Sequence, residues 1–285
     1  MEQATKNVFV ETKVRGCNPG YVVTSDGVVV IDTPQLPTRA IKMREEAEAK
    51  GPIRYLINTE HHVDHIFGNY YFKGAGAVVS HVAVYNEFMT VTPELNPYNY
   101  AKEALPTDDP EGVPFFPDEQ TYFADNNKPT VTITGDATLR VGKHTFELLH
   151  TPGHSPGELA VYIPEERIVF ASDTIFHQCQ TWLYASDVDE WIKSLDRLKE
   201  LDVDIVVPGH GPICTKREIA VQKAFLLEWV STVASLAAKG LSKEECIQHM
   251  EPIKNRFPVD IGQEYMLDFV IEKNTSALYD KMVML

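Results

Sequence analysis

The chain has 285 residues, of which 44% are hydrophobic and 24% charged, so it can bury a sizeable core and extended disorder is not expected. Acidic residues outnumber basic ones by 41 to 26, and the formal net charge of −15 argues against nucleic-acid or anionic-membrane partners, which need clustered lysine and arginine. The four cysteines form no CxxC pair and no leader-like segment is visible, so we expect a reduced cytoplasmic protein. No apolar run approaches the roughly 20 residues that cross a bilayer.

The first third of the chain alternates between predicted strands and helices. Valine-rich stretches on both sides of a Ser25-Asp-Gly27 turn are typical of a hairpin. Pro37 is placed to open a helix that Gly51-Pro52 would end. In chain order we expect a hairpin over 21–32, a helix over 37–50, strands over 53–58 and 77–80, and a helix over 81–89.

Residues 90–130 differ in composition from the rest of the chain. The segment holds seven of the 18 prolines, six aromatic residues, eight carboxylates and two lysines. Structureless loops of this length are uncommon in compact domains and are often lids or disordered inserts. Because disordered segments are usually poor in aromatic residues, we favour an ordered lid or an oligomer contact over disorder.

The remainder of the chain repeats the alternation and then becomes helical. Strands are predicted over 131–134, 138–141, 144–149, 158–163, 168–171 and 204–207, with a helix over 187–200 and three helical pieces from 216 onward, broken near Gly240 and over 251–258. We see no linker that divides the core. The expected organisation is a core over 1–215, which includes the 90–130 insert, and a helical extension over 216–285 that packs on the same domain.

Potential metal ligands follow several of the predicted strands. Asn58-Thr-Glu-His-His-Val-Asp-His65 comes directly after a strand, and His154, Asp173 and His210 each lie beside small or turn-forming residues where a later strand stops. A sheet presents ligands in this way at one edge. Imidazole and carboxylate donors without thiolate favour zinc, iron or manganese over copper. These residues alone predict a site for one or two metal ions.

The order of these motifs resembles the metallo-β-lactamase superfamily. The family pattern has HxHxDH, a histidine in a TPGH-like turn, an aspartate in an SGD-like turn and a last histidine in PGHG. This chain has Glu60-His-His-Val-Asp-His65, Thr151-Pro-Gly-His154, Ser172-Asp173 and Pro208-Gly-His210-Gly in that order. The resemblance covers about residues 8–215. It implies an α/β fold, a four-layer αβ/βα sandwich, here with an inserted loop and extra C-terminal helices.

The resemblance also implies a ligand set for two divalent metal ions, zinc foremost, with manganese or iron as alternatives. One ion would be held by Glu60, His62 and His154, and the other by Asp64, His65 and His210, with Asp173 bridging the two. The family has histidine where this chain has Glu60. We prefer Glu60 to the adjacent His61 as the ligand because extended backbone puts residues 60 and 62 on the same side.

The implied activity is that of a metal-dependent hydrolase. A metal-bound hydroxide, oriented by Asp64 as a catalytic residue, would open an ester, lactone or amide/lactam bond. Phe176, His177, Trp182 and Tyr184 follow Asp173 and are candidates for substrate binding. Together with the aromatic residues of the acidic 90–130 segment, they favour a small neutral or aromatic substrate over an anionic glutathione thioester.

Several alternatives remain open at this point. An iron-dependent redox enzyme of the sulfur dioxygenase type, a thioesterase of the glyoxalase II type and a non-catalytic homologue all belong to the same superfamily. We expect a small-molecule substrate, no nucleic-acid or membrane partner, and leave a homodimer open. A nucleophilic Cys179 is disfavoured, Asp32 is expected to hydrogen-bond to the ligand loops, and a structural role is expected for His81, His144, His150 and His249.

The glutamate at position 60 generates a prediction about pH. It lowers the net charge of a two-metal cluster by one unit relative to histidine, and a less positive cluster acidifies its water less. In pH–rate profiles we therefore expect the acid limb of the native enzyme to lie at higher pH than that of the Glu60→His variant. An identical or lower acid limb in the native enzyme would contradict this account.

Overall fold

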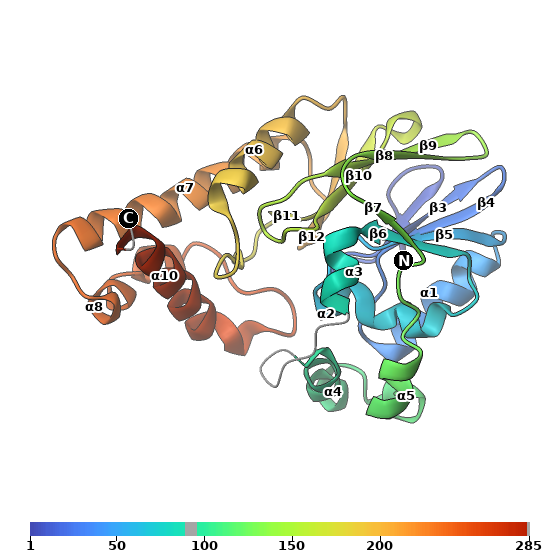
Figure 1. Ribbon diagram of the computed structural model, residues 1–285, viewed down its shortest axis with the longest axis horizontal. Coiled ribbons are helices and arrows are strands. Elements are labelled where there is room, and N and C mark those ends of the chain that lie inside the picture. Colours follow the sequence, from blue (N-terminus) through green and yellow to red (C-terminus); the bar gives the residue numbers. More distant parts are fainter. Residues whose placement is uncertain (89–95, 284–285) are drawn as a thin grey trace.

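Two β-sheets pack face to face in the computed structural model, which describes residues 1–88 and 96–283 (Figure 1). The first sheet has seven strands in sequence order: β1 (Glu2–Gln3), β2 (Val8–Val10), β3 (Gly20–Thr24), β4 (Gly27–Ile31), β5 (Ile53–Ile57), β6 (Ala77–His81) and β7 (Val131–Ile133). Neighbours are antiparallel up to β4 and parallel from β4 to β7. The predicted hairpin is confirmed, whereas β1 and β2 were not predicted.

The second sheet has five strands in the order β12-β11-β10-β9-β8. Its members are β8 (Ala137–Val141), β9 (His144–His150), β10 (Leu159–Ile163), β11 (Ile168–Phe176) and β12 (Ile205–His210). Only the pair β11 and β12 is parallel among these neighbours. Both of these strands run further than the sequence predicts, so Asp173 and His210 lie on strands rather than in turns beyond them.

Three apolar layers hold the sheets and helices together. Side chains such as Val29, Ile57, Phe146 and Val161 fill the space between the sheets. Helix α1 (Pro37–Glu48) and the 3₁₀ helix η1 (Phe67–Phe72) cover the outer face of the first sheet, and α6 (Val188–Lys199) covers that of the second. The result is the predicted four-layer αβ/βα sandwich, which is thereby confirmed.

The segment predicted as an inserted loop is largely helical where the structure describes it. After α3 (Val82–Phe88), positions 89–95 lie outside the described residues; then come α4 (Pro97–Asp108), the 3₁₀ helix η2 (Pro110–Phe115) and α5 (Glu119–Ala124). The side chains of Asn96 and Asp118 cap α4 and α5. The prediction of a loop is wrong here because such capped helices can begin within a proline-rich stretch: proline is tolerated in the first turn of a helix.

Several aromatic residues of this insert pack around Phe67. Tyr98, Tyr122 and the partly buried Phe116 surround the fully buried Phe67, which follows the histidine-rich motif on η1. The ring of Phe67 stacks on Tyr122 with centroids 4.5 Å apart and on Phe116 at 5.2 Å. These rings therefore anchor the insert on η1, next to the histidine-rich motif.

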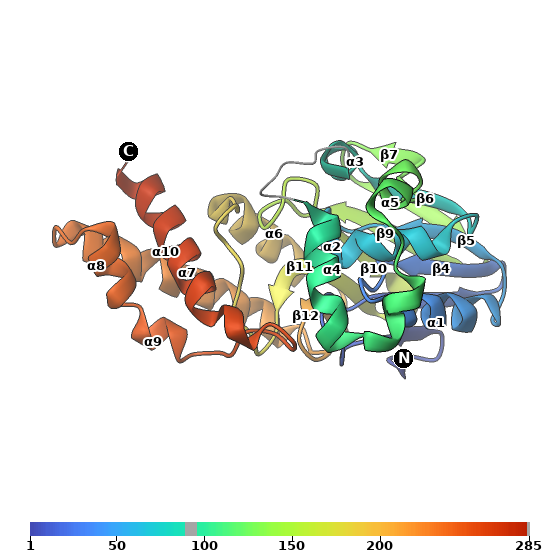
Figure 2. The same cartoon turned by 90° about the horizontal axis from the view of Figure 1, so that it is seen from below.

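The C-terminal extension forms a helical lobe beside the second sheet (Figures 1 and 2). It contains α7 (Arg217–Ala238), α8 (Lys243–Gln248), α9 (Glu251–Lys254), the 3₁₀ helix η4 (Glu264–Met266) and α10 (Leu267–Val283), so a short helix lies where a break was predicted. Within the described residues, α7 is long and apolar enough to cross a membrane by length and composition alone, contrary to the sequence expectation. One face of α7, with Phe225, Leu226 and Trp229, is buried in the core against the second sheet and α6.

Phe67 connects the insert to the site, so its removal tests that packing. Truncating a fully buried phenylalanine leaves a cavity, and we expect Phe67→Ala to lower the free energy of unfolding by about 3–5 kcal/mol. Phe115 of the same insert is 55% exposed, and Phe115→Ala should change stability by less than about 0.5 kcal/mol. Chemical denaturation of both variants measures the free energy of unfolding. Equal losses in the two variants would show that packing around Phe67 does not stabilise the protein more than the exposed Phe115 does.

Candidate metal centre

The predicted ligands converge where the two sheets meet. Glu60 and His62 lie in the loop after β5, and Asp64 and His65 lie on the one-turn helix α2 (Val63–Ile66) that follows. Across from them, the second sheet contributes His154 from the β9–β10 loop, Asp173 from β11 and His210 at the end of β12. The short helix α2 was not predicted. This helix places Asp64 and His65 beside His210, whereas Glu60 and His62 lie beside His154.

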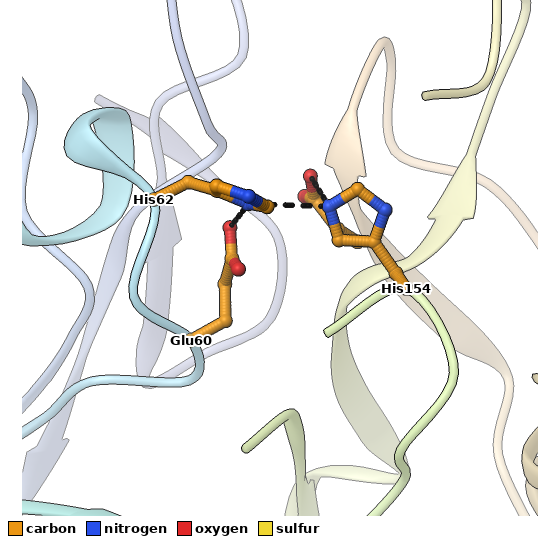
Figure 3. Close-up of side chains that lie close together, drawn as sticks. Glu60, His62 and His154 are labelled. Atoms are coloured by element: carbon orange, nitrogen blue, oxygen red, sulfur yellow. Dashed lines mark hydrogen bonds and ion pairs between the residues drawn. The ribbon is translucent and has the colours of Figure 1, made fainter. Parts of the chain in front are cut away.

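The first donor set contains Glu60, His62, His154 and Asp173, whose ligand atoms all lie within 4.8 Å of one another. Figure 3 shows Glu60 and His62 on one side of the site facing His154 on the other. The Nδ1 atom of His62 lies 2.7 Å from Oε1 of Glu60 and 3.2 Å from Nε2 of His154. The same Nε2 atom of His154 lies 3.3 Å from Oδ2 of Asp173.

The second donor set contains Asp64, His65 and His210, again with ligand atoms within 4.8 Å. The Nε2 atom of His210 lies 3.3 Å from Oδ2 of Asp64. Asp173 reaches this set as well, because its Oδ1 lies 3.2 Å from Nε2 of His65 and its Oδ2 lies 3.4 Å from Nε2 of His210. The structure thus gathers all seven predicted ligands, with Asp173 in contact with members of both sets.

These residues fit a pair of divalent metal ions. Among the residues that the structure describes, Oε2 of Glu60, Nε2 of His65 and Oδ1 of Asp173 are buried and make no hydrogen bond. Leaving such atoms unsatisfied in the interior costs free energy, and a bound cation would satisfy them. The donors are nitrogen and oxygen, which suit zinc, manganese or iron. His61, the alternative ligand, lies outside both donor sets found among the described residues.

The electrostatics among the side chains favour the ligating form of Glu60 and His154. At His62 and His65 the neighbouring negative charges outweigh burial and raise the pKa of the imidazole, to about 8 for His62. Burial alone would raise the pKa of Glu60, but the neighbouring His62 and His65 hold it below its ordinary value, so this carboxylate is ionised. Burial lowers the pKa of His154, which keeps its imidazole neutral with a lone pair free for a cation. Burial, together with the adjacent His62, also lowers the pKa of His61, to about 4.

Hydrogen bonds from outside the cluster orient two of its rings. Nδ1 of His65 lies 2.9 Å from Oδ2 of Asp32, and Asp32 also accepts bonds from the backbone N–H (2.7 Å) and hydroxyl (2.5 Å) of Thr59. Asp32 thus makes the hydrogen bonds to the ligand loop that the sequence analysis expected. Nδ1 of His154 is held by the Trp182 carbonyl at 2.9 Å. Both rings are left with Nε2 turned toward the site, as a metal ligand requires.

Cys17, Asp32 and His65 form a third group of potential ligands, which we interpret as support rather than a site. Burial raises the pKa of the Cys17 thiol to about 12, and its sulfur donates to the backbone carbonyl of Asp64 at 3.0 Å. Burial likewise raises the pKa of Cys179, which favours the protonated thiol over the nucleophilic thiolate.

The four residues predicted to bind substrate lie in two different environments. Phe176 is buried and its ring stacks on His210, with centroids 5.1 Å apart. Nδ1 of His177 lies 2.7 Å from the Pro212 carbonyl, and its Nε2 faces Glu218, so the structure does not bring His177 to the cluster. The physical reason is that β11 continues to Phe176 and pairs it with His210, which turns the next residue away.

Trp182 and Tyr184 lie closer to the cluster. The Trp182 carbonyl holds His154, and the ring of Trp182 lies 6.4 Å from Tyr184 and 6.3 Å from Phe269 of α10. Phe269 was missed because it lies on the C-terminal extension, far from every motif. Glu158, also missed, is a buried carboxyl group whose pKa is raised well above its ordinary value by burial and by Glu60.

Gly209, in the Pro208-Gly-His210 motif, leaves room for the carboxylate of Asp173. A substitution at this glycine therefore tests the packing of the metal centre. A Cβ atom on Gly209 would lie 1.9 Å from Oδ1 of Asp173 and 2.7 Å from the Ser172 backbone, so Gly209→Ala must displace Asp173. We expect this variant to bind less metal per chain and to lose about 1–3 kcal/mol of stability. Gly135→Ala, where a Cβ would meet nothing within 4 Å, is the matched control. Elemental analysis of both proteins measures the difference, and full metal content in Gly209→Ala would contradict it.

Comparisons with known proteins agree with this geometry. The model of the metallo-beta-lactamase superfamily matches residues 12–210. A probable hydroxyacylglutathione hydrolase of Schizosaccharomyces pombe is 26% identical over 206 residues, which cover 70% of this chain and 65% of that protein. A metallo-beta-lactamase type 2 of Elizabethkingia meningoseptica is 26% identical over 214 residues, covering 72% and 73%.

A solved structure has the same fold over nearly the whole chain. The metallo-beta-lactamase family protein of Thermus thermophilus aligns with a TM-score of 0.65 at 17% identity and covers 97% of this chain and 94% of its own. Curated relatives are often matched over a smaller part: the alignments span 24%, 32% and 65% of the length of three of them. The match to the family model covers all seven ligands and more than half of the sequence, and the chain belongs to the metallo-beta-lactamase superfamily.

Proposed function

We propose that this protein is a metal-dependent hydrolase that opens an ester, lactone or amide/lactam bond of a small neutral or aromatic substrate. The observation that carries the proposal is the pair of buried donor sets that share Asp173. Two divalent ions bound there, zinc foremost, would polarise the substrate carbonyl and activate a water molecule. Asp64 lies 3.3 Å from His210 at the second set, where its carboxylate can orient that water and accept its proton.

The preference for an apolar substrate rests on the aromatic residues beside His154. Trp182 and Tyr184 lie on the segment that holds His154 in place, and Phe269 extends the same aromatic surface from the C-terminal helix. Aromatic walls with a few polar groups are typical of sites for small organic ligands. The net charge of −15 further disfavours anionic substrates. We retain a small-molecule substrate and a cytoplasmic location as proposals.

A thioesterase of the glyoxalase II type is the second candidate. Its support is that several relatives are named hydroxyacylglutathione hydrolase, in Bartonella henselae and Schizosaccharomyces pombe among others. The donor sets would serve a thioester as well as an ester, so the two candidates differ in the acyl and leaving groups that the surrounding side chains accept.

A substrate panel with metal analysis tests these proposals. We expect about two divalent ions per chain and turnover of chromogenic aryl esters, lactones or lactams above that of a glutathione thioester. Trp182→Ala keeps the backbone carbonyl that holds His154 but removes the ring, and should reduce kcat/KM for an aromatic substrate about tenfold relative to an acetyl ester. Phe115→Ala, an exposed aromatic residue on the insert, is the control.

Three outcomes would redirect the assignment. A glutathione thioester as the best substrate would favour the glyoxalase II type. Bound iron with an absorbance change on oxidation would favour the redox alternative. An absence of turnover on every ester, lactone, lactam and thioester by metal-loaded protein would contradict a hydrolase.

A further inference from the structure

The loop between α9 and α10 returns from the helical lobe to the metal centre. In Figure 1 it reaches from the lobe toward the sandwich, and Figure 2 shows the same approach from below. Asp260 lies in this loop, and its Oδ2 is 2.8 Å from Nδ1 of His210. The family model ends at residue 210, so this carboxylate belongs to a part of the chain outside the matched segment.

We propose that Asp260 is a positioning residue for the metal centre, through which the C-terminal extension completes the second donor set. His210 presents Nε2 to Asp64 and Asp173, while its Nδ1 faces Asp260. A carboxylate that accepts from the outer nitrogen fixes the tautomer and the orientation of the ring and makes the inner nitrogen a better donor. Asp260 thus does for His210 what Asp32 does for His65.

Hydrogen bonds fix the loop backbone before and after Asp260. Before it, the side chain of the buried Gln180 donates to the Phe257 carbonyl at 2.8 Å, and the Gln180 backbone N–H donates to the Pro258 carbonyl at 2.7 Å. After it, Nη1 of Arg15 donates to the Gly262 carbonyl at 2.7 Å. A loop whose backbone is fixed at these points has little conformational freedom, so the Asp260 carboxylate stays within hydrogen-bond distance of His210.

Arg15 also connects this loop to the core beside the cluster. Its side chain is 6% exposed, pairs with Asp108 of α4 at 3.1 Å and donates to the hydroxyl of Tyr265 at 3.2 Å. Gly262 has a φ of +75°, and a Cβ there would lie 3.1 Å from the Arg15 side chain. Gly16, which follows Arg15 in the chain, packs against Asp64, since a Cβ there would lie 3.0 Å from Asp64 Cβ. The extension is therefore docked against the segment that supports the second donor set.

The inference concerns metal binding and holds whichever substrate the enzyme takes. The test uses the full chain with Asp260→Asn, which keeps the shape but not the charge, and Asp260→Ala, which removes the acceptor. Asp268→Asn is the matched control, because Asp268 lies on the same extension, its side chain is 87% exposed and it pairs with Lys254 at the surface. Zinc affinity is measured by competition with a chromogenic chelator, and the thermal midpoint is measured on chelator-treated protein.

We expect Asp260→Ala to weaken one of two zinc equivalents by about 10- to 100-fold, Asp260→Asn to weaken it less, and Asp268→Asn to match the native protein. The thermal midpoint of the chelator-treated variants should stay close to native. Native affinity for both equivalents in Asp260→Ala would overturn the proposal. A lowered thermal midpoint combined with native zinc affinity would also overturn it and make Asp260 a tether for the extension. Because metal binding is measured without substrate, this result is independent of the proposed hydrolase activity.

Discussion

The shared carboxylate of Asp173 is the constraint on which the rest of the site depends. It contacts His154 of one donor set and both His65 and His210 of the other, at 3.2 to 3.4 Å. Three buried carboxylates and four imidazoles can be packed together only if charge is balanced and every donor atom finds a partner. The sandwich meets this requirement by bringing the ends of β5, β11 and β12 to one edge, and by placing a glycine at position 209 where any side chain would displace Asp173.

Three separate parts of the chain hold the ligand rings from outside. Asp32 at the end of β4 orients His65, the Trp182 carbonyl after β11 orients His154, and Asp260 in the extension orients His210. A displacement in any of these segments therefore changes a ring that contacts Asp173. The aromatic packing of the insert on Phe67 also supports the second donor set. Phe67 directly follows the helix that carries Asp64 and His65, so its packing helps to fix that helix.

The sequence predicts well what depends on short spacings. The strand before Glu60 and the turn-forming neighbours of His154 and His210 are local features that predict a metal site, and the resemblance of their order to the metallo-β-lactamase superfamily implies the seven ligands. What it misses depends on packing between distant segments. Nothing near Asp260 marks it, because its partner His210 lies 50 positions earlier and the intervening helices set the path of the loop. The sequence also does not show that His177 lies away from the cluster, because pairing of β11 with β12 decides where that residue faces.

The glutamate at position 60 changes the cluster in more than its charge. Oε1 of Glu60 lies 2.7 Å from Nδ1 of His62 and 3.2 Å from Nε2 of His65, so this one oxygen contacts a ligand of each donor set. An imidazole at this place would offer a single ring nitrogen to the site, directed along one line. A carboxylate has two oxygens with several lone pairs, and the second oxygen of Glu60 is buried and makes no hydrogen bond within the described residues. Glu60 and Asp173 thus connect the donor sets from opposite sheets, and a substitution at position 60 alters the environment of both.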